Sequence, residues 1–364
     1  MIRTPLTDLL GIRHPIVQTG MGYVSGARLT AATSAAGGLG FIASATMSPE
    51  TLRSVIKEVK ERTDAPFGVN VRSDAPDVAE RIELIIAEGV RAASFALAPR
   101  RDLMARLKDA GVVVIPSVGA RRHAEKVAAW GADAVIAAGG EAGGHTGAVP
   151  TSLLIPQVAA AVDIPVVAAG GFFDGRGLIA ALAYGAAGIA MGTRFLLTSD
   201  SPVPDAVKRM YLKAGLAGTV VTSQVDGVPH RVLRTSMVDH LDSQGTRWLS
   251  GVRRAGGVVR SARNAVAYRE MSGMGWRQML GQGQAMRRES GLTWGQVLMA
   301  ANTPVLLRAA MVDGRTDLGL MSSGQVAGLI DDLPSCAELI EAIMREAEAG
   351  LEAMATLRSV SRDF

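Results

Sequence analysis

The sequence predicts a (β/α)8 TIM barrel, an α/β fold, with a mainly helical and basic C-terminal elaboration. Within the first 200 residues, eight short apolar runs alternate with amphipathic stretches of helical periodicity. The apolar runs are continuous rather than alternating, which is typical of parallel strands covered on both faces. Eight successive βα units favour a closed barrel over an open sheet.

The predicted strands, in chain order, cover residues 15–21, 39–44, 67–71, 91–98, 112–118, 132–138, 165–171 and 188–195. The predicted helices between them cover residues 27–36, 49–62, 77–87, 101–109, 121–130, 153–162 and 177–184. The alternative is an open Rossmann-type sheet, in which G-x-G-x-x-G joins the first strand to the first helix. The chain reads QTGMGYVSG at 18–26, and these glycines have a different spacing.

The character of the sequence changes after residue 200. A barrel takes about 250 residues, and the chain has 364. Residues 207–288 carry fourteen Lys and Arg against four Asp and Glu, whereas the whole chain has a net charge of +4. We expect a barrel over 1–205, a basic, mainly helical insertion or cover over 206–310, and C-terminal helices over 311–364 that pack back on the barrel. Ser335 and Glu338 form an S-x-x-E capping box, which predicts a helix from Ser335 onward.

The composition excludes several classes of protein. One cysteine, Cys336, rules out a disulfide framework and a Cys-rich metal site, and we expect it to be an inert core or helix residue. No His or carboxylate spacing indicates a metal. The aromatic content of 4% disfavours binding of single-stranded nucleic acid. The start of the chain has no signal-peptide pattern, and no apolar stretch approaches twenty residues. We therefore expect a cytoplasmic protein that binds neither membrane nor nucleic acid.

The most informative stretch is AAGGEAGGHTG at 137–147, which follows the sixth predicted strand. In a barrel this loop lies at the carboxyl face, where such enzymes have their active sites. Its two Gly-Gly pairs allow backbone to pass close to a flat ligand. It carries Glu141 and His145, and histidine, which titrates near neutral pH, is the better suited to abstract a carbon-bound proton. The alternative is a glycine-rich surface loop with an incidental histidine.

Two further glycine-bearing loops follow the seventh and eighth predicted strands. The first contains Gly170 and Gly171, with a helix beginning near Asp174, and the second contains Gly192 and Thr193. Barrels commonly bind phosphate on these two loops, through backbone amides and a helix N-terminus. The alternative is that glycine serves tight barrel corners. Met21 and Asn70 end the first and third strands, where each could contact a ring system or only fill space.

At these residues the chain resembles the nitronate monooxygenase (2-nitropropane dioxygenase-like) superfamily of FMN-dependent barrel enzymes. The resemblance covers about residues 5–235 and rests on ordered blocks at 18–21, 36–40, 67–70, 141–145, 168–177 and 191–195. It implies non-covalent FMN, with its phosphate on the seventh and eighth strand loops, and His145 as the catalytic base. The flavin contacts that it implies are Gly20, Met21, Asn70, Ala138, Gly143, Gly170, Gly171, Ala190, Met191, Gly192 and Thr193.

Two positions depart from the family pattern, and the C-terminal part adds a second resemblance. Enzymes that oxidise nitronates usually have Pro at the position of Gly20 and tend to have Gln at that of Ala138. The runs at 297–304 and 322–335 are similar to a subgroup that acts in actinobacterial breakdown of steroid rings. The subgroup implies dehydrogenation of a coenzyme A thioester. The alternatives are a nitronate monooxygenase that uses O2, and a flavin- or nucleic-acid-binding module without turnover.

Arginines dominate the basic segment and suit a phosphate-rich substrate. Twelve of its fourteen cations are Arg, whose planar fork matches phosphate oxygens two at a time. Coenzyme A carries a 3′-phosphate and a diphosphate, so we expect Arg231, Arg234, Arg247, Arg253 or Arg254 to contact a CoA ester. The alternative is a solvated cationic face. The sequence leaves the exact acyl group, the electron acceptor and the oligomeric state open.

Overall fold

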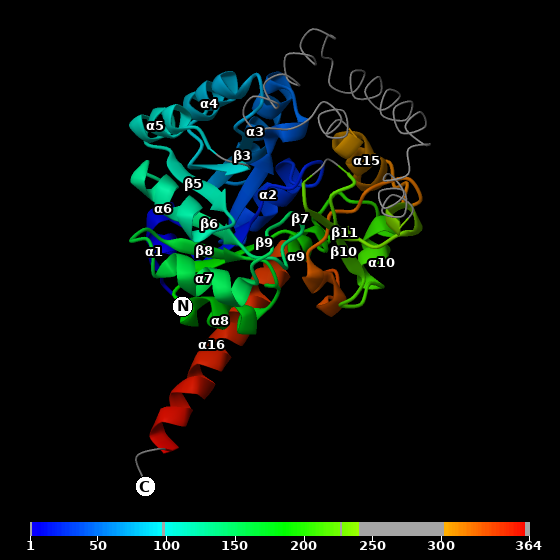
Figure 1. Ribbon diagram of the computed structural model, residues 1–364. Coiled ribbons are helices and arrows are strands. Elements are labelled where there is room, and N and C mark those ends of the chain that lie inside the picture. Colours follow the sequence, from blue (N-terminus) through cyan, green and yellow to red (C-terminus); the bar gives the residue numbers. More distant parts are fainter. Residues whose placement is uncertain (1, 97–98, 226–227, 240–301, 361–364) are drawn as a thin grey trace.

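The computed structural model describes residues 2–96, 99–225, 228–239 and 302–360 of the chain (Figure 1). Eight parallel strands form a closed barrel in the order β1-β2-β3-β4-β5-β6-β8-β9. Their bounds are Ile16–Gln18, Leu39–Ala43, Phe67–Arg72, Ala92–Ala96, Val113–Val118, Val135–Ala138, Val166–Ala169 and Gly188–Met191. Pairing of β1 with β9, Val17 opposite Ala190, closes the ring. This arrangement confirms the predicted TIM barrel.

Helices surround the barrel and continue beyond it. Those that precede or alternate with the strands are α1 (Pro5–Leu10), α2 (Ala27–Ala35), α3 (Pro49–Arg62), α4 (Val78–Ala87), α5 (Arg101–Asp109), α6 (Arg121–Ala129), α7 (Thr151–Ala159) and α8 (Gly175–Ala183). Those that follow the last barrel strand are α9 (Thr193–Leu196), α10 (Asp205–Leu212), α15 (Asn302–Met311) and α16 (Cys336–Val360). Short 3-10 helices cover Ser44–Thr46 and Gln325–Leu329.

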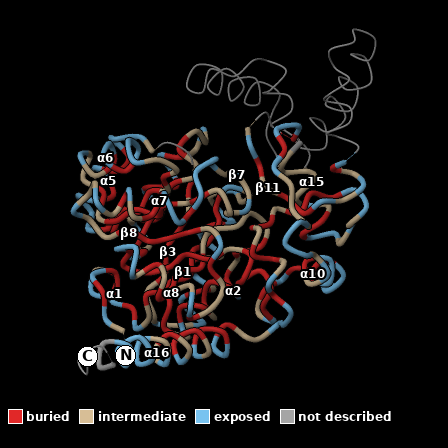
Figure 2. The backbone as a smooth tube through the Cα atoms, turned by 60° about the horizontal axis from the view of Figure 1, so that its bottom comes forward, coloured by how far each residue is buried: buried red, intermediate tan, exposed pale blue. Residues whose placement is uncertain are grey.

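The strands are buried on both faces, as the tube in Figure 2 shows. Successive side chains of a strand point to opposite faces. In β1, Val17 therefore joins the cluster inside the barrel, whereas Ile16 joins the cluster between strands and helices. Leu6 of α1 belongs to the inner cluster and lies against Gly188, the first residue of β9, so α1 closes the amino end of the barrel. The opposite, carboxyl rim is left for a binding site.

The chain after the barrel returns to that rim. Strands β10 (Thr219–Thr222) and β11 (His230–Leu233) pair with β7 (Gly144–His145), a short strand in the loop after β6, as an antiparallel sheet of order β10-β11-β7. Helix α16 then packs against α8 and α2, and its last turns project away from the body (Figure 1). The predicted cover over 206–310 falls largely on 240–301, outside the described residues, so the division into three parts stays a prediction.

The predicted capping box before α16 is confirmed. The Ser335 hydroxyl accepts the Glu338 amide at 3.2 Å, and the Glu338 carboxylate accepts the Ser335 amide at 2.8 Å. The thiol of Cys336 is buried in the core, and burial raises its pKa to about 12. A thiol with that pKa is inert at neutral pH, as the sequence predicted.

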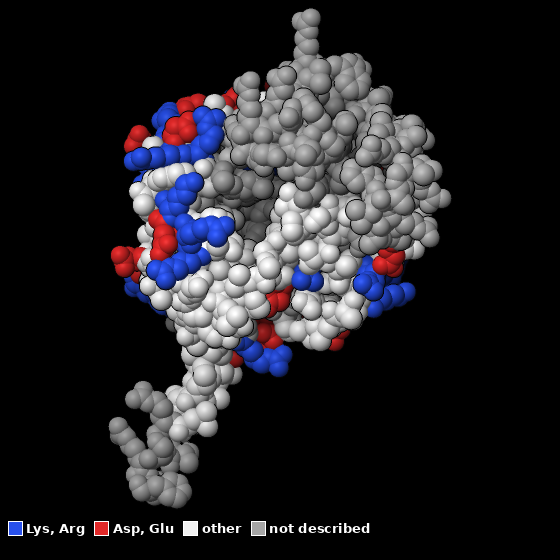
Figure 3. All heavy atoms as spheres, viewed as in Figure 1, with Lys and Arg blue, Asp and Glu red and all other residues white. Residues whose placement is uncertain are grey.

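Positive charges on the described part of the barrel lie beside negative ones. On the face shown in Figure 3, Lys and Arg are intermixed with Asp and Glu around α5 and α6. Ion pairs such as Arg106–Glu83 at 2.7 Å and Arg121–Glu125 at 2.7 Å account for this pattern. Among the described helices, none is both long and apolar enough to cross a membrane.

Candidate active site

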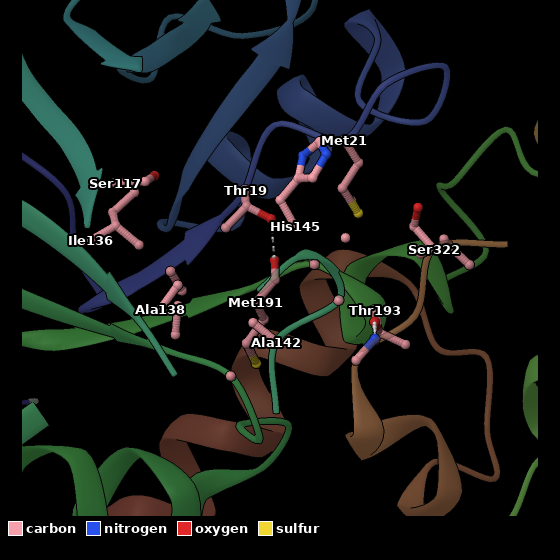
Figure 4. Close-up of a pocket in the computed structure, with 18 of the residues that line it drawn as sticks. Thr19, Met21, Ser117, Ile136, Ala138, Ala142, His145, Met191, Thr193 and Ser322 are labelled. Carbon is pink, nitrogen blue, oxygen red and sulfur yellow. Dashed lines mark hydrogen bonds between the residues drawn. The ribbon is translucent and has the colours of Figure 1, made fainter. Parts of the chain in front are cut away.

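A cavity of about 360 Å³ opens at the carboxyl rim of the barrel (Figure 4). Its volume lies in the usual range for small-molecule sites, roughly 300 to 1,000 Å³. The residues predicted from the sequence that line it are Met21, Asn70, Ala138, Gly143, His145, Gly170, Gly171, Ala190, Met191, Gly192 and Thr193. The fold therefore brings these residues, from five separate loops and strand ends, to one place.

Gly20 lies just behind the wall of the cavity. A Cβ atom at this position would be 2.5 Å from the Cβ atom of Asn70, so the Asn70 side chain occupies the space that a larger residue would need. The Asn70 amide is fixed in turn by donating from Nδ2 to Ser94 Oγ at 2.8 Å. Glycine at position 20 thus leaves room for the Asn70 side chain, which β3 places at the rim.

The loop after β6 carries His145 and is tightly built. A Cβ atom on Gly139 would lie 2.1 Å from Thr151 Oγ1, so only glycine lets the loop pass α7. Gly144 has φ +75°, a conformation that favours glycine, and the chain then continues as β7. The His145 side chain is exposed and projects into the cavity beside Thr19 and Met21 (Figure 4).

Glu141, the other titratable residue of this loop, caps a helix. Its carboxylate accepts hydrogen bonds from the Thr151 amide at 2.9 Å and from the Thr151 hydroxyl at 2.5 Å, at the start of α7. Its carbonyl accepts the Gln325 amide at 2.9 Å. Because the carboxylate and the carbonyl of Glu141 both accept hydrogen bonds within the protein, His145 is better placed than Glu141 to act on a ligand.

Arg231, expected to contact a CoA ester, contacts this loop instead. Its Nε and Nη2 donate to the Gly140 carbonyl at 3.2 and 2.9 Å, and its Nη1 donates to Thr219 Oγ1 at 3.1 Å. Burial lowers the pKa of Arg231, although the nearby Glu141 charge acts in the opposite direction. The half-buried guanidinium therefore ties the loop that carries His145 to β10 and β11.

The other predicted arginines are placed differently. Arg234 is exposed and forms a long ion pair with Asp239 at 3.7 Å. Arg247, Arg253 and Arg254 lie outside the described residues. Among the residues that the structure describes, neither Arg231 nor Arg234 lines the cavity.

The loops after β8 and β9 form a cradle of backbone amides. Gly170 and Gly171 have φ values of +99° and +83°, and such consecutive glycines turn successive N–H groups toward one point. Among the described residues, the amides of Gly170, Gly171, Gly192 and Thr193 have no hydrogen-bond acceptor. Unsatisfied donors at the bottom of a cavity suit an anion such as a phosphate.

The N-terminus of α8 does not contribute to this cradle, which corrects the sequence-based expectation. The Gly177 amide donates to the Asp174 carboxylate at 2.8 Å, and the Gly175 amide donates to Glu346 of α16 at 2.8 Å. Two carboxylates thus occupy the helix end. The donors without an acceptor on this side of the cradle are the amides of the glycine pair before the helix.

The part of the site that sequence reasoning missed comes from the C-terminal segment. Ser322, Gly324 and Val326 line the cavity, as do Leu307 and Met311 near or at the end of α15. The Gly324 amide donates to Thr193 Oγ1 at 2.8 Å, which joins this segment to the loop after β9. The run at 322–335 was notable only as a resemblance, because no local pattern shows which barrel loop a distant segment will meet.

The walls of the cavity fit a flat cofactor with a phosphate. Ala138, Ala169 and Ala190 offer a floor of small side chains at the ends of β6, β8 and β9, next to the amide cradle. Asn70, Thr19 and Ser117 provide a few polar groups around that floor. Among the described residues, His, Cys, Asp and Glu form no group that could hold a metal ion.

Comparison with known proteins gives consistent results. A family model described as nitronate monooxygenase matches residues 3–346. A Mycobacterium tuberculosis protein named (3aS,4S,5R,7aS)-5-hydroxy-7a-methyl-1-oxo-octahydro-1H-indene-4-carboxyl-CoA dehydrogenase is 63% identical over 98% of this chain and 99% of its own. A Rhodococcus jostii protein of the same name is 58% identical over 98% of this chain and 99% of its own. The solved structure of FabK from Thermotoga maritima superposes with a TM-score of 0.81, at 35% identity, over 98% of this chain and 100% of that one.

Proposed function

This chain belongs to the nitronate monooxygenase family, and we propose that within it the chain is an FMN-dependent dehydrogenase of a coenzyme A thioester. That it is an oxidoreductase enzyme follows from the family and from its dehydrogenase relatives. The observation that carries the proposal is the 63% identity, across nearly the whole chain, to a protein named as a carboxyl-CoA dehydrogenase. The reaction belongs, by the subgroup resemblance, to steroid-ring degradation.

The amide cradle and the alanine floor support FMN as the cofactor. Gly170, Gly171, Gly192 and Thr193 would bind its phosphate, and Ala138 and Ala190 would lie against its ring. When bound, the flavin would supply the acceptor for a hydride. The Rossmann fingerprint of many dinucleotide sites does not occur after the first strand, which favours FMN over FAD.

His145 would act as the general base. A thioester carbonyl acidifies the C–H next to it, and the exposed imidazole projects into the cavity where such a carbon would lie. His145 takes the proton while the hydride leaves the neighbouring carbon, so that a double bond conjugated to the thioester forms.

The CoA moiety would be bound by the remaining arginines of the basic segment. Because Arg231 contacts Gly140, we assign the phosphate contacts to Arg234, Arg247, Arg253 and Arg254. Their excess of positive charge suits a 3′-phosphate and a diphosphate.

A second candidate function is oxidation of a nitronate by O2, which the family description favours. His145 does not discriminate between the two, since proton abstraction beside a nitro group is analogous. Gly20 and Ala138, where nitronate-oxidising enzymes usually have Pro and Gln, favour the thioester.

Two measurements test the proposal. Heat release and chromatography should recover FMN from the purified protein; recovery of FAD, or no flavin after reconstitution, contradicts the cofactor. Anaerobic mixing with the indene-carboxyl-CoA ester named for the relatives should then bleach the flavin absorbance faster than mixing with propyl-2-nitronate. Rapid bleaching by the nitronate alone would establish the second candidate.

The role of His145 is tested by His145→Ala. We expect FMN to remain bound and flavin reduction to slow by about 10²- to 10⁴-fold, the usual contribution of a general base. The control is His123→Ala, which removes an exposed histidine on α6. Native reduction rates in the His145 variant would exclude it as the base.

A further inference from the structure

We propose that His230 is a positioning residue, whose buried ring holds the imidazole of His145 in the orientation that proton abstraction needs. The inference rests on the proposed role of His145 as the base. Three features support it: the strand register, the contact between the two rings and the burial of His230.

The register of the small sheet places the two histidines together. Strands β7 and β11 are antiparallel, and His145 lies directly opposite His230. Opposite residues of such a pair project to the same face of the sheet, with Cβ atoms about 5 Å apart. The two ring centroids accordingly lie 4.8 Å apart with an interplanar angle of 56°.

The same register places Arg231 on the other face. Arg231 is opposite Gly144, and alternation along β11 directs its guanidinium away from the histidine pair, to the Gly140 carbonyl. Adjacent residues of β11 thus act on different parts of the loop. Arg231 holds its backbone, and His230 contacts its functional side chain.

His230 is itself rigidly held. Its side chain is 3% exposed, and a hydrogen bond of 2.8 Å joins its Nε2 to Ser322 Oγ. The Ser322 carbonyl accepts a hydrogen bond of 2.7 Å from the buried Tyr211 hydroxyl. Ser322 belongs to the segment that closes the cavity, as Figure 4 shows, so the docked C-terminal segment fixes the His230 ring.

His145 is exposed, whereas His230 is buried and hydrogen-bonded, and this difference indicates how the pair works. An exposed histidine has two side-chain torsions to restrict before it can act as a base, and misplacement by about 1 Å can cost 10²-fold in rate. The fixed ring of His230 restricts the torsions of His145 from the side away from solvent. The contact should therefore change the rate of proton abstraction and leave substrate affinity nearly unchanged.

The test compares three substitutions of His230 in the FMN-loaded enzyme, with the indene-carboxyl-CoA ester as substrate. His230→Ala and His230→Asn remove the ring, and Asn retains a polar group toward Ser322. His230→Phe retains a ring without the nitrogen atoms. We expect Ala and Asn to lower kcat about 10- to 100-fold with little change in KM, and Phe to stay within about threefold of the native enzyme. A native rate in His230→Asn together with a slow His230→Phe would assign the effect to the hydrogen bond with Ser322 and overturn the proposal. A native rate in His230→Ala would also overturn it, and so would a rate in His230→Phe as low as that in His230→Ala.

A double-variant cycle separates this inference from the proposed function. If His230 acts through His145, His230→Ala should cause no further loss of rate in a His145→Ala background. A further loss there overturns the positioning role, whereas a native rate in His145→Ala alone overturns the proposed base. Thermal unfolding and FMN content show which variants fail to fold. If His230→Ala is one of them, the rates of His230→Phe and His230→Asn test the positioning role. The matched control is His14→Ala, a half-buried histidine before β1, for which we expect a native kcat.

Discussion

At the scale of single residues, two charged side chains have structural roles that their chemistry alone does not predict. An arginine in a basic segment is a natural phosphate ligand, yet three nitrogen atoms of Arg231 donate to the Gly140 carbonyl and to Thr219. A glutamate in a glycine-rich loop is a natural acid or base, yet Glu141 caps α7 through Thr151. Gly140 lies 91 residues before Arg231 in the sequence, whereas Thr151 follows Glu141 by only ten residues.

Substitutions of Arg231 and Arg234 should therefore affect different kinetic constants. Arg231→Met removes hydrogen bonds from a charged group and should destabilise the fold by about 2 kcal/mol. It should also lower kcat, because the loop that carries His145 loses its anchor. Arg234→Met should leave kcat unchanged and raise KM for a CoA ester. Steady-state kinetics measure kcat and KM of both variants, and thermal unfolding measures their stability. The same increase in KM in both variants would indicate that Arg231 contacts the substrate.

At the scale of elements, the loop after β8 supplies part of the proposed phosphate site. Its two glycines have positive φ, and the amides of the pair have no acceptor among the described residues. The following helix contributes nothing to this donor set, since Asp174 and Glu346 cap it. The proposed phosphate site therefore depends on the conformation of the loop and not on the helix end.

Gly171→Ala should weaken FMN binding beyond its effect on stability. A left-handed alanine costs about 1 kcal/mol, so the backbone would tend to leave the conformation that directs its amides to one place. The added Cβ atom itself would lie 3.8 Å from the Glu141 Cβ atom. The matched control is Gly89→Ala, where φ is +62° and a Cβ atom would meet nothing within 4 Å. Both variants should lose similar stability, but only Gly171→Ala should show a raised Kd for FMN in fluorescence titration. Equal FMN affinity in the two would place the phosphate elsewhere.

At the scale of the whole molecule, the C-terminal segment completes the site. A Cβ atom on Gly143 would lie 2.5 Å from the Gly324 amide nitrogen, so glycine lets the segment dock on the loop that carries His145. The same segment holds Ser322 against His230 and Gly324 against Thr193. Loops that are more than 100 residues apart in the sequence thus form one wall of the cavity.

Gly143→Ala should disturb this docking. Overpacking of this kind typically costs about 1–3 kcal/mol, and we expect a lower unfolding temperature together with weaker FMN binding and a lower kcat. Gly147→Ala is the control in the same loop, because a Cβ atom there would lie 3.7 Å from its nearest neighbour. If both variants behave like the native enzyme, docking of the C-terminal segment does not shape the site.

The basic segment should act on the substrate through charge. Charge reversal at Arg247, Arg253 or Arg254 should raise KM for a CoA ester several-fold and leave FMN affinity unchanged. Added salt should also weaken substrate binding, because exposed phosphate contacts are screened within about 10 Å at 0.1 M. Kinetics at two ionic strengths measure both effects. A KM that responds neither to these reversals nor to salt would favour the solvated cationic face.

The sequence by itself determined the barrel and most of the loops at its rim. Continuous apolar strands need cover on both faces, and parallel strands place their carboxyl ends together, so Asn70, His145 and Gly171 were expected at one rim. These are local patterns repeated along the chain, and the structure brings these residues to one cavity.

Only the tertiary structure decided which long-range partners those residues meet. No spacing links His230 to His145, Ser322 to His230 or Arg231 to Gly140, since these contacts follow from how the chain after the barrel folds back on its rim. Nor does a local pattern show that Glu346 caps α8, which removes that helix end from the anion site. Hydrophobic periodicity specifies which face of each element is buried, whereas a hydrogen-bond partner depends on where two distant faces meet.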